Sequence, residues 1–140
     1  MKVLVTGAGG FLGRSVVRAA AGAGHHVVAM HRPASLPDPA SLPAGVEILP
    51  GDLRQPGRWA EHLSGIEAVI HCAAAASGNL PTQLAGTVVA TENLLAALPE
   101  SLKRFVHVSS LSVYDFSAPR WHGCLDEDTP LESRPLRRDA

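Results

Sequence analysis

The chain has 140 residues, enough for one domain with a sizeable core, and its hydrophobic fraction of 46% is typical of a globular protein rather than a disordered one. Its 12 basic and 13 acidic side chains nearly cancel, so charge gives no support for a surface that binds nucleic acid or an anionic membrane. No apolar run approaches the roughly 20 residues needed to span a bilayer. We therefore expect a soluble, cytoplasmic protein in which Cys72 and Cys124 are free thiols.

Strands and helices are predicted to alternate along most of the chain. The predicted strands are aliphatic segments over residues 2–6, 26–30, 46–49, 67–72 and 104–109. Helices are predicted after the first glycine cluster, over residues 56–63, and over residues 79–98, where Asn79 is the candidate N-cap. This alternation requires right-handed crossovers. It predicts an α/β fold, a Rossmann-type parallel sheet of about five strands with helices on both faces.

Apolar spacing predicts which face two of these helices bury. In the first helix the predicted face comprises Leu12, Val16, Ala19 or Ala20, and Ala23. In the helix over residues 79–98 it comprises Leu84, Val88, Thr91, Leu95 and Leu98. From Ser117 onward the pattern stops. We therefore predict a nucleotide-binding domain over residues 1–116 and, over residues 117–140, an irregular tail that begins a catalytic or substrate region.

A glycine turn lies between the first strand and the first helix. Gly7, Gly10 and Gly13 follow the spacing G-x-x-G-x-x-G rather than the literal G-x-G-x-x-G. At such a turn a pyrophosphate meets free backbone N–H groups and the positive end of the helix dipole. Gly7 would make the tight turn, Gly10 would leave room for the phosphate, and Gly13 would let the helix approach the strand. The alternative is a tight turn with no ligand. The strand and helix around it favour a dinucleotide site that includes Phe11 and Leu12.

The end of the second strand indicates which dinucleotide is preferred. NAD sites usually place an acidic residue there to accept from the ribose 2′-hydroxyl, whereas this chain has His31 and Arg32. A guanidinium can pair with a 2′-phosphate, and Arg14 could add to the positive field. The alternative is that Arg32 is a solvated loop residue. We predict NADP as the cofactor, with NAD as the second possibility.

Four short motifs occur in order, and together they resemble a known family. They are Thr6-Gly7-x-x-Gly10-x-x-Gly13, Gly51-Asp52-Leu53, His71-Cys72-Ala73-Ala74 and Ser109-Ser110-x-Ser112-Val113-Tyr114. The chain resembles the N-terminal portion of the extended short-chain dehydrogenase/reductase family, of the NAD-dependent epimerase/dehydratase type.

The resemblance implies roles for individual residues. Asp52 and the Leu53 backbone would contact the adenine, while Cys72, Ala73 and Ala74 would line the ribose and nicotinamide side. Ser110 would be the catalytic serine that holds the substrate oxygen. A cofactor-contacting asparagine of the family falls on Thr87 here, and a glycine three residues later is Ala90, which are departures from its pattern. Taken alone, the small residues could instead pack under a helix, and the serines could cap a turn.

The proton-transfer dyad of the family, a tyrosine with a lysine four residues later, cannot be built from this chain. Its single tyrosine, Tyr114, is followed four residues later by Ala118, and its only lysines are Lys2 and Lys103. We therefore expect an N-terminal fragment of a longer enzyme, inactive by itself. The parent would be an oxidoreductase or epimerase that transfers hydride between the nicotinamide and a carbonyl or hydroxyl carbon of a small-molecule substrate.

The two alternative functions are a redox sensor and a metal hydrolase. A non-catalytic NAD(P)-binding redox sensor would keep the glycine turn and lack the dyad. A metal hydrolase is disfavoured, because the seven histidines form no H-x-x-x-H pair, and we expect no metal site. The helix over residues 79–98 is a candidate surface for a homodimer.

Overall fold

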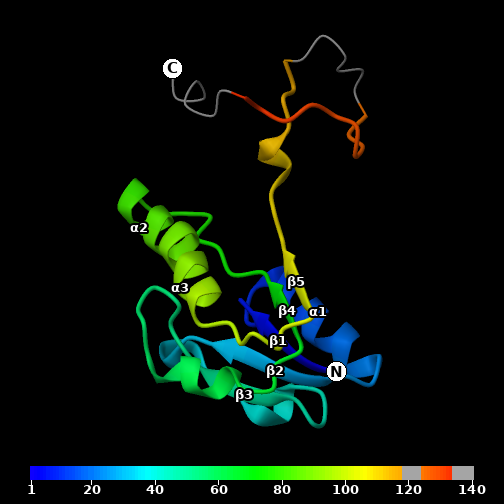
Figure 1. Ribbon diagram of the computed structural model, residues 1–140, viewed down its shortest axis with the longest axis vertical. Coiled ribbons are helices and arrows are strands. Elements are labelled where there is room, and N and C mark those ends of the chain that lie inside the picture. The colour runs from blue at the N-terminus through cyan, green and yellow to red at the C-terminus, as the bar shows by residue number, and fades with distance from the viewer. Residues whose placement is uncertain (118–123, 134–140) are drawn as a thin grey trace. The chain divides into compact units, whose positions relative to one another are not determined.

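The computed structural model describes residues 1–117 and 124–133 (Figure 1). The chain divides into two compact units, Met1–Val108 and Ser109–Ala140. The predictions made for residues 118–123 and 134–140, including the position of Ala118, lie outside the described residues. The predicted division at residue 116 stays a prediction.

The first unit is built on one parallel sheet. Its five strands lie in the order β3-β2-β1-β4-β5, and their bounds are β1 Lys2–Thr6, β2 His26–His31, β3 Glu47–Pro50, β4 Ala68–His71 and β5 Arg104–His107. Along the chain, β2 and β3 are added on one side of β1, and β4 and β5 are then added on its other side, which is the Rossmann-type order. The predicted fold class is confirmed, and each strand lies within two residues of its predicted bounds.

Helices cover both faces of this sheet. On one face lies α1, Phe11–Gly22; on the other lie a 3₁₀ helix, Arg58–Leu63, and a long helix in three parts, α2 Leu80–Leu84, a π-helical turn Ala85–Val89 and α3 Ala90–Ala96. Val3 and Val5 of β1 pack toward α1, whereas Leu4 packs toward Trp59 and Leu94 on the opposite face. Because successive side chains of a strand point to opposite faces of the sheet, the aliphatic residues of β1 contribute to two hydrophobic cores, one on each face.

The predicted buried face of α1 is correct at Ala20, which is buried, and in part at Val16, which packs against the core, but it is wrong at Leu12 and Ala23. The helix buries Gly13, Val17 and Ala20, whereas Leu12 keeps 44% of its surface exposed. The small side chains face the sheet because they allow the helix axis to approach the strands closely. A pattern based on bulk alone selects the neighbouring stripe.

The predicted face of the long helix is correct in part at Thr91 and Leu98, which are half-buried, but wrong at three leucine and valine positions. Its buried residues are Ala90 and Leu94, while Leu84, Val88 and Leu95 are exposed. The contact side includes Gly86, where an added Cβ would lie 2.6 Å from Cβ of Ala75. The π-helical turn adds one residue to the helical repeat, so apolar residues before and after it do not share one regular stripe. The homodimer surface proposed for this helix stays a prediction.

The second unit contains a 3₁₀ turn, Leu111–Val113, and an isolated antiparallel bridge between Tyr114 and Leu131. Two backbone hydrogen bonds flank the bridge, from Asp115 N to Pro130 O at 2.8 Å and from Glu132 N to Val113 O at 2.7 Å. The backbone on either side of the undescribed segment 118–123 is therefore paired. Among the described residues of both units, no helix is both long enough and apolar enough to cross a membrane.

Candidate nucleotide-binding site

A groove of about 610 Å³ lies at the carboxyl ends of β1, β2 and β4, where the strand order reverses direction about β1. Open α/β sheets bind their ligands at this topological switch point, and the volume falls in the range of small-molecule sites. Glycine, alanine and a few polar residues line it: Gly7, Gly9, Gly10, Met30, His31, Arg32, Ser35, Gly51, Asp52, Leu53, Arg54, Cys72, Ala73, Ala74, Ala75, Ala76, Ser77, Thr82, Gly86 and Ala90.

The glycine turn forms one wall of the groove. Gly7 has a φ of 64°, in the left-handed region, and a Cβ there would lie 2.8 Å from the backbone nitrogen of Ala73. Gly10 N donates to Gly7 O at 2.9 Å, which closes the turn. No side chain caps the amino end of α1, and its first turn carries no acidic residue. The positive end of this helix dipole is therefore open to an anion.

The end of β2 forms a second wall. His31 keeps only 6% of its surface exposed, and burial lowers its pKa, so the ring is neutral at pH 7. Its Nε2 has no hydrogen-bond partner among the described residues. Arg32 follows it on the groove surface, and the hydroxyl of Ser35 donates to the Arg32 carbonyl at 3.4 Å. Donor-rich side chains thus stand where many dinucleotide sites carry a carboxylate.

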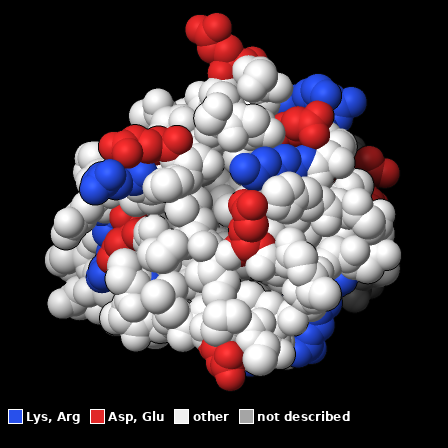
Figure 2. Space-filling model, turned by 90° about the horizontal axis from the view of Figure 1, so that it is seen from below, with Lys and Arg blue, Asp and Glu red and all other residues white. Residues whose placement is uncertain are grey.

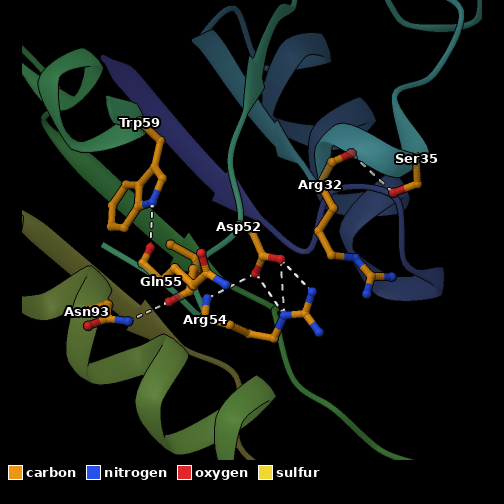
Figure 3. Close-up of polar contacts among 8 residues, drawn as sticks. Arg32, Ser35, Asp52, Arg54, Gln55, Trp59 and Asn93 are labelled. Carbon is orange, nitrogen blue, oxygen red and sulfur yellow. Dashed lines mark hydrogen bonds and ion pairs between the residues drawn. The ribbon is translucent and has the colours of Figure 1, made fainter. Parts of the chain in front are cut away.

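The carboxylate of Asp52 is held by Arg54 (Figure 3). The guanidinium donates from Nε to both carboxylate oxygens, at 3.0 and 3.1 Å, and from Nη2 to Oδ2 at 2.6 Å. The backbone nitrogen of Arg54 adds a fourth bond, to Oδ1, at 3.0 Å. These hydrogen bonds and the positive charge of Arg54 lower the pKa of Asp52, and Arg32 contributes a weaker effect in the same direction.

The segment that carries Asp52 is anchored from two other elements. Asn93 of α3 donates from Nδ2 to the carbonyl of Leu53 at 2.8 Å, and the Trp59 indole donates to Gln55 O at 3.1 Å (Figure 3). Gly51 N donates to His31 O at 2.8 Å, which continues the β2–β3 pairing into this segment. Leu53 itself is buried in the core. The backbone bordering the groove is therefore held in place.

The segment after β4 forms another wall, which adjoins the glycine turn. The backbone nitrogen of Ala73 donates to Oγ1 of Thr6 at 3.3 Å, and that of Ala75 donates to Oγ1 of Thr87 at 3.1 Å. Burial raises the pKa of the Cys72 thiol, which therefore stays protonated at pH 7. Side chains no larger than methyl or thiol leave space for a flat ligand along this wall.

Most residues predicted to bind the cofactor border this one groove. They are Gly7, Gly10, Arg32, Asp52, Leu53, Cys72, Ala73 and Ala74. Gly13 lies beneath the turn, and Thr87 lies behind the groove wall. The side chains of Phe11 and Leu12 are exposed and do not line the groove. Their roles toward a ligand stay predictions.

Ser110 belongs to the second unit. It is the N-cap of the 3₁₀ turn, and its Oγ accepts from Ser112 N at 3.1 Å and from Ser112 Oγ at 2.9 Å. The capping role that the serines alone suggested is therefore present. The catalytic role stays a prediction.

Sequence reasoning did not single out several residues of the groove, among them Gly9, Ser35, Arg54, Ala75 and Ala76. Arg54 had a signal, since an arginine two residues after an aspartate can fold back onto the carboxylate. Ala75 and Ala76 continue the alanine run that begins at Ala73. Gly9 lies within the glycine turn itself, whereas no local pattern identifies Ser35, which reaches the groove through the course of the backbone.

Two observations concern other kinds of site. In the described part of the chain, no three metal-binding side chains of the His, Cys, Asp or Glu type come together. On the face drawn in Figure 2, basic and acidic side chains are interspersed among uncharged ones. The groove between the glycine turn and the β4 segment is therefore the site with the clearest ligand chemistry among the described residues.

The parallel sheet, glycine turn and groove at the switch point define a Rossmann-type nucleotide-binding domain. The family model described as the NAD dependent epimerase/dehydratase family matches residues 3–137. The chain belongs to this family, as its four motifs indicated.

Similar proteins include enzymes of several activities. A 2-alkyl-3-oxoalkanoate reductase of Stenotrophomonas maltophilia (strain K279a) is 35% identical over 116 residues, which cover 81% of this chain and 34% of the relative. A 3 beta-hydroxysteroid dehydrogenase/Delta 5-->4-isomerase of Mycobacterium tuberculosis (strain CDC 1551 / Oshkosh) is 36% identical over 124 residues, which cover 80% of this chain and 32% of the relative. The chain thus spans about a third of the length of these relatives.

Solved structures agree with this assignment. MoeE5 in complex with UDP-glucose and NAD has a TM-score of 0.75 at 31% identity, over 94% of this chain and 42% of that one. UDP-glucuronic acid 4-epimerase from Bacillus cereus in complex with NAD has a TM-score of 0.72 at 26% identity, over 96% and 47%. The shared region in each case is less than half of the solved chain.

Proposed function

We propose that this chain is the NAD(P)-binding portion of an oxidoreductase or epimerase, and that the groove holds the dinucleotide. The observation that carries the proposal is the glycine cradle. Gly7, Gly9 and Gly10 border the groove beside the uncapped amino end of α1, so a phosphate can approach backbone N–H groups without meeting a side chain.

The residues of the groove fit the parts of a dinucleotide. The pyrophosphate would be held by Gly10 and by the backbone of Phe11 and Leu12. The adenine would face Asp52 and the Leu53 backbone. The nicotinamide side would be bordered by Ala73 and Ala74. Asp52 already accepts four hydrogen bonds from Arg54, so an adenine amino group would share the carboxylate with that guanidinium or displace one of its bonds. A bound nicotinamide cofactor supplies hydride donation or acceptance. The chain itself supplies binding and orientation.

We propose NADP as the preferred form, on the basis of charge. Arg32 and Arg54 both border the groove near Asp52, and Ser35 adds a hydroxyl. Asp52 is already paired with Arg54, so its negative charge opposes a 2′-phosphate less than a free carboxylate would. The names of the solved relatives mention NAD. Those relatives are different proteins, and the arginines of this groove are the argument for the phosphorylated form.

The test compares dissociation constants for NADPH and NADH by calorimetry on the 140-residue chain. We expect NADPH to bind about 10-fold to 100-fold more tightly, as charged hydrogen bonds to a phosphate imply. Arg32→Gln should remove most of that ratio and leave NADH binding unchanged. Arg58→Gln is the matched control, because Arg58 does not line the groove and pairs with Glu61, at 3.7 Å. Preferential binding of NADH by the unmodified chain would overturn the NADP assignment.

We also propose that this chain alone does not turn over substrate. The tyrosine–lysine dyad is not encoded in it, so Ser110 could hold a substrate oxygen but no such pair could transfer the proton. The purified chain should bind NADPH yet show no oxidation of it with 2-alkyl-3-oxoalkanoates, the substrate type named for one relative. Turnover above the rate of the Ser110→Ala variant would contradict the inactivity.

A further inference from the structure

A buried histidine joins three elements behind the groove. His71, the last residue of β4, is fully buried, with 0% of its surface exposed. Its Nδ1 lies 2.6 Å from Oγ1 of Thr6, the residue that precedes the glycine turn. Its Nε2 lies 3.0 Å from Oγ1 of Thr91 in α3. The imidazole therefore bridges β1 and the helix across the carboxyl end of β4.

The neighbouring bonds determine the direction of each hydrogen bond at this ring. Thr91 Oγ1 donates its only proton to the carbonyl of Thr87 at 2.6 Å, so it must accept from His71 Nε2–H. The neutral ring then has an unprotonated Nδ1, which accepts from the hydroxyl of Thr6. The Thr6 oxygen in turn accepts from the backbone nitrogen of Ala73.

The result is one directional chain of hydrogen bonds. It runs from Ala73 N–H to the Thr6 hydroxyl, then to His71, to the Thr91 hydroxyl and to the Thr87 carbonyl. The chain of bonds therefore begins at Ala73, and it ends at Thr87, whose side chain separately accepts from Ala75 N. The segment 73–75 borders the groove.

We infer that His71 is a positioning residue: as a neutral ring protonated at Nε2, it links Thr6 to Thr91 and thereby fixes the backbone of residues 73–75 for the dinucleotide. The cofactor part of this inference rests on the proposed function. Burial lowers the pKa of His71 to about 4, with a smaller contribution from the nearby His107, so the ring is neutral at pH 7. His107 stacks on His71 with ring centroids 5.4 Å apart but belongs to no part of the chain of bonds.

The first experiment needs no ligand. Nitrogen-15 NMR at pH 7 should show the His71 proton on Nε2 and none on Nδ1. A ring protonated at Nδ1 would reverse the order of donors and overturn the inference.

The second experiment measures local backbone opening by amide hydrogen exchange. Thr91→Val keeps the shape of the side chain but removes the acceptor for Nε2–H, and Thr91→Ser retains it. We expect exchange at Ala73 and Ala75 to be about tenfold faster in Thr91→Val, because a buried donor loses its partner. Exchange at Leu4 and Val5, in the centre of β1, should stay unchanged, and Thr91→Ser should behave as the unmodified chain. Equal acceleration everywhere would indicate general destabilisation and contradict the positioning role.

The third experiment measures the dissociation constant of NADPH. Thr91→Val and Thr6→Val should each weaken binding about tenfold, and the double variant should lose less than the product of the two, since both substitutions break one chain. His107→Asn is the control for loss of the stacked ring and should leave binding within about twofold.

If the unmodified chain binds NADPH and the threonine variants bind equally well, the positioning role is overturned. If the unmodified protein binds neither NADPH nor NADH, the proposed function fails, and the cofactor part of the inference fails with it. The first two experiments still decide in that case whether the chain of hydrogen bonds through His71 exists.

Discussion

Gly13 of α1 lies directly against the backbone of Gly7, at a separation that leaves no room for a side chain. A Cβ atom on Gly13 would lie 2.7 Å from the carbonyl carbon of Gly7 and 2.9 Å from Cα of Ala8. The contact brings the amino end of α1 close to β1. The third glycine of the motif therefore acts in packing, while the first provides the backbone conformation of the turn.

Substitution Gly13→Ala should lower the free energy of unfolding by about 1–3 kcal/mol, because the added methyl group forces the helix away from the strand. Urea unfolding measures the change. Gly22→Ala is the matched control in the same helix, since a Cβ at Gly22 meets nothing within 4 Å. It should raise stability by about 0.5–1 kcal/mol, the gain of alanine over glycine in a helix. Equal effects of the two substitutions would contradict the close contact.

Leu94 and Leu95 test which face of α3 is buried. Leu94 is fully buried in the core, whereas Leu95 keeps 48% of its surface exposed. Leu94→Ala should cost about 2–5 kcal/mol through lost burial and a cavity. Leu95→Ala should change stability by no more than about 0.5 kcal/mol. Thermal and urea unfolding of both variants would decide between this face and the one that apolar spacing favours, for which the order of the effects is reversed.

The pairing of Asp52 with Arg54 should be visible in a carboxyl titration. Arg54→Met removes the guanidinium, so the pKa of Asp52 should rise toward its ordinary value of 3.8. Because the folded-state pKa is lowered in the unmodified chain, the stabilisation by this pair is present above that ordinary value and is lost as the pH falls through the lowered one. Carbon-13 NMR of the side-chain carboxyl measures the titration. Arg58→Met is the control, and an unchanged Asp52 titration in Arg54→Met would refute the pairing.

The buried ring of His71 predicts a loss of stability in mild acid. Its pKa falls from 6.5 to about 4 in the folded chain, so the unfolded chain binds the proton more readily. Stability from this source is complete above pH 6.5 and declines as the pH falls toward 4. The decline amounts to about 3 kcal/mol for a shift of this size.

Urea unfolding across this pH window, compared with His71→Asn, measures that decline. Asparagine does not titrate, so the variant should depend on pH less steeply by that amount. His107 faces the ring from β5 and lowers the His71 pKa further, so His107→Asn should make the decline smaller without removing it. Parallel curves for the unmodified chain and His71→Asn would show that His71 titrates alike in the folded and unfolded states.

Much of the architecture follows from local pattern. The five aliphatic runs became the five strands, and the pattern is strongest in the central strands β1 and β2, which are buried almost throughout because helices cover both faces of the sheet. The glycine turn was found from its spacing, and Asn79 does cap its helix, accepting from Thr82 N at 3.0 Å. The 3₁₀ helix over Arg58–Leu63 was predicted as a short helix starting earlier, since Pro56 marks only where a helix can begin.

The class of fold, the position of the turn and the family can be predicted from residue type and spacing along the chain. Which helical faces are buried depends instead on how the helices pack against the sheet. The closeness of approach at Gly13 and Gly86 selects small residues over bulky ones, and no single helix encodes that distance. The tertiary structure also brings together the hydrogen-bond partners around the groove, such as Asn93 with the Leu53 carbonyl and Thr6 with His71. Local sequence does not reveal these bonds, because they join residues 40 and 65 positions apart.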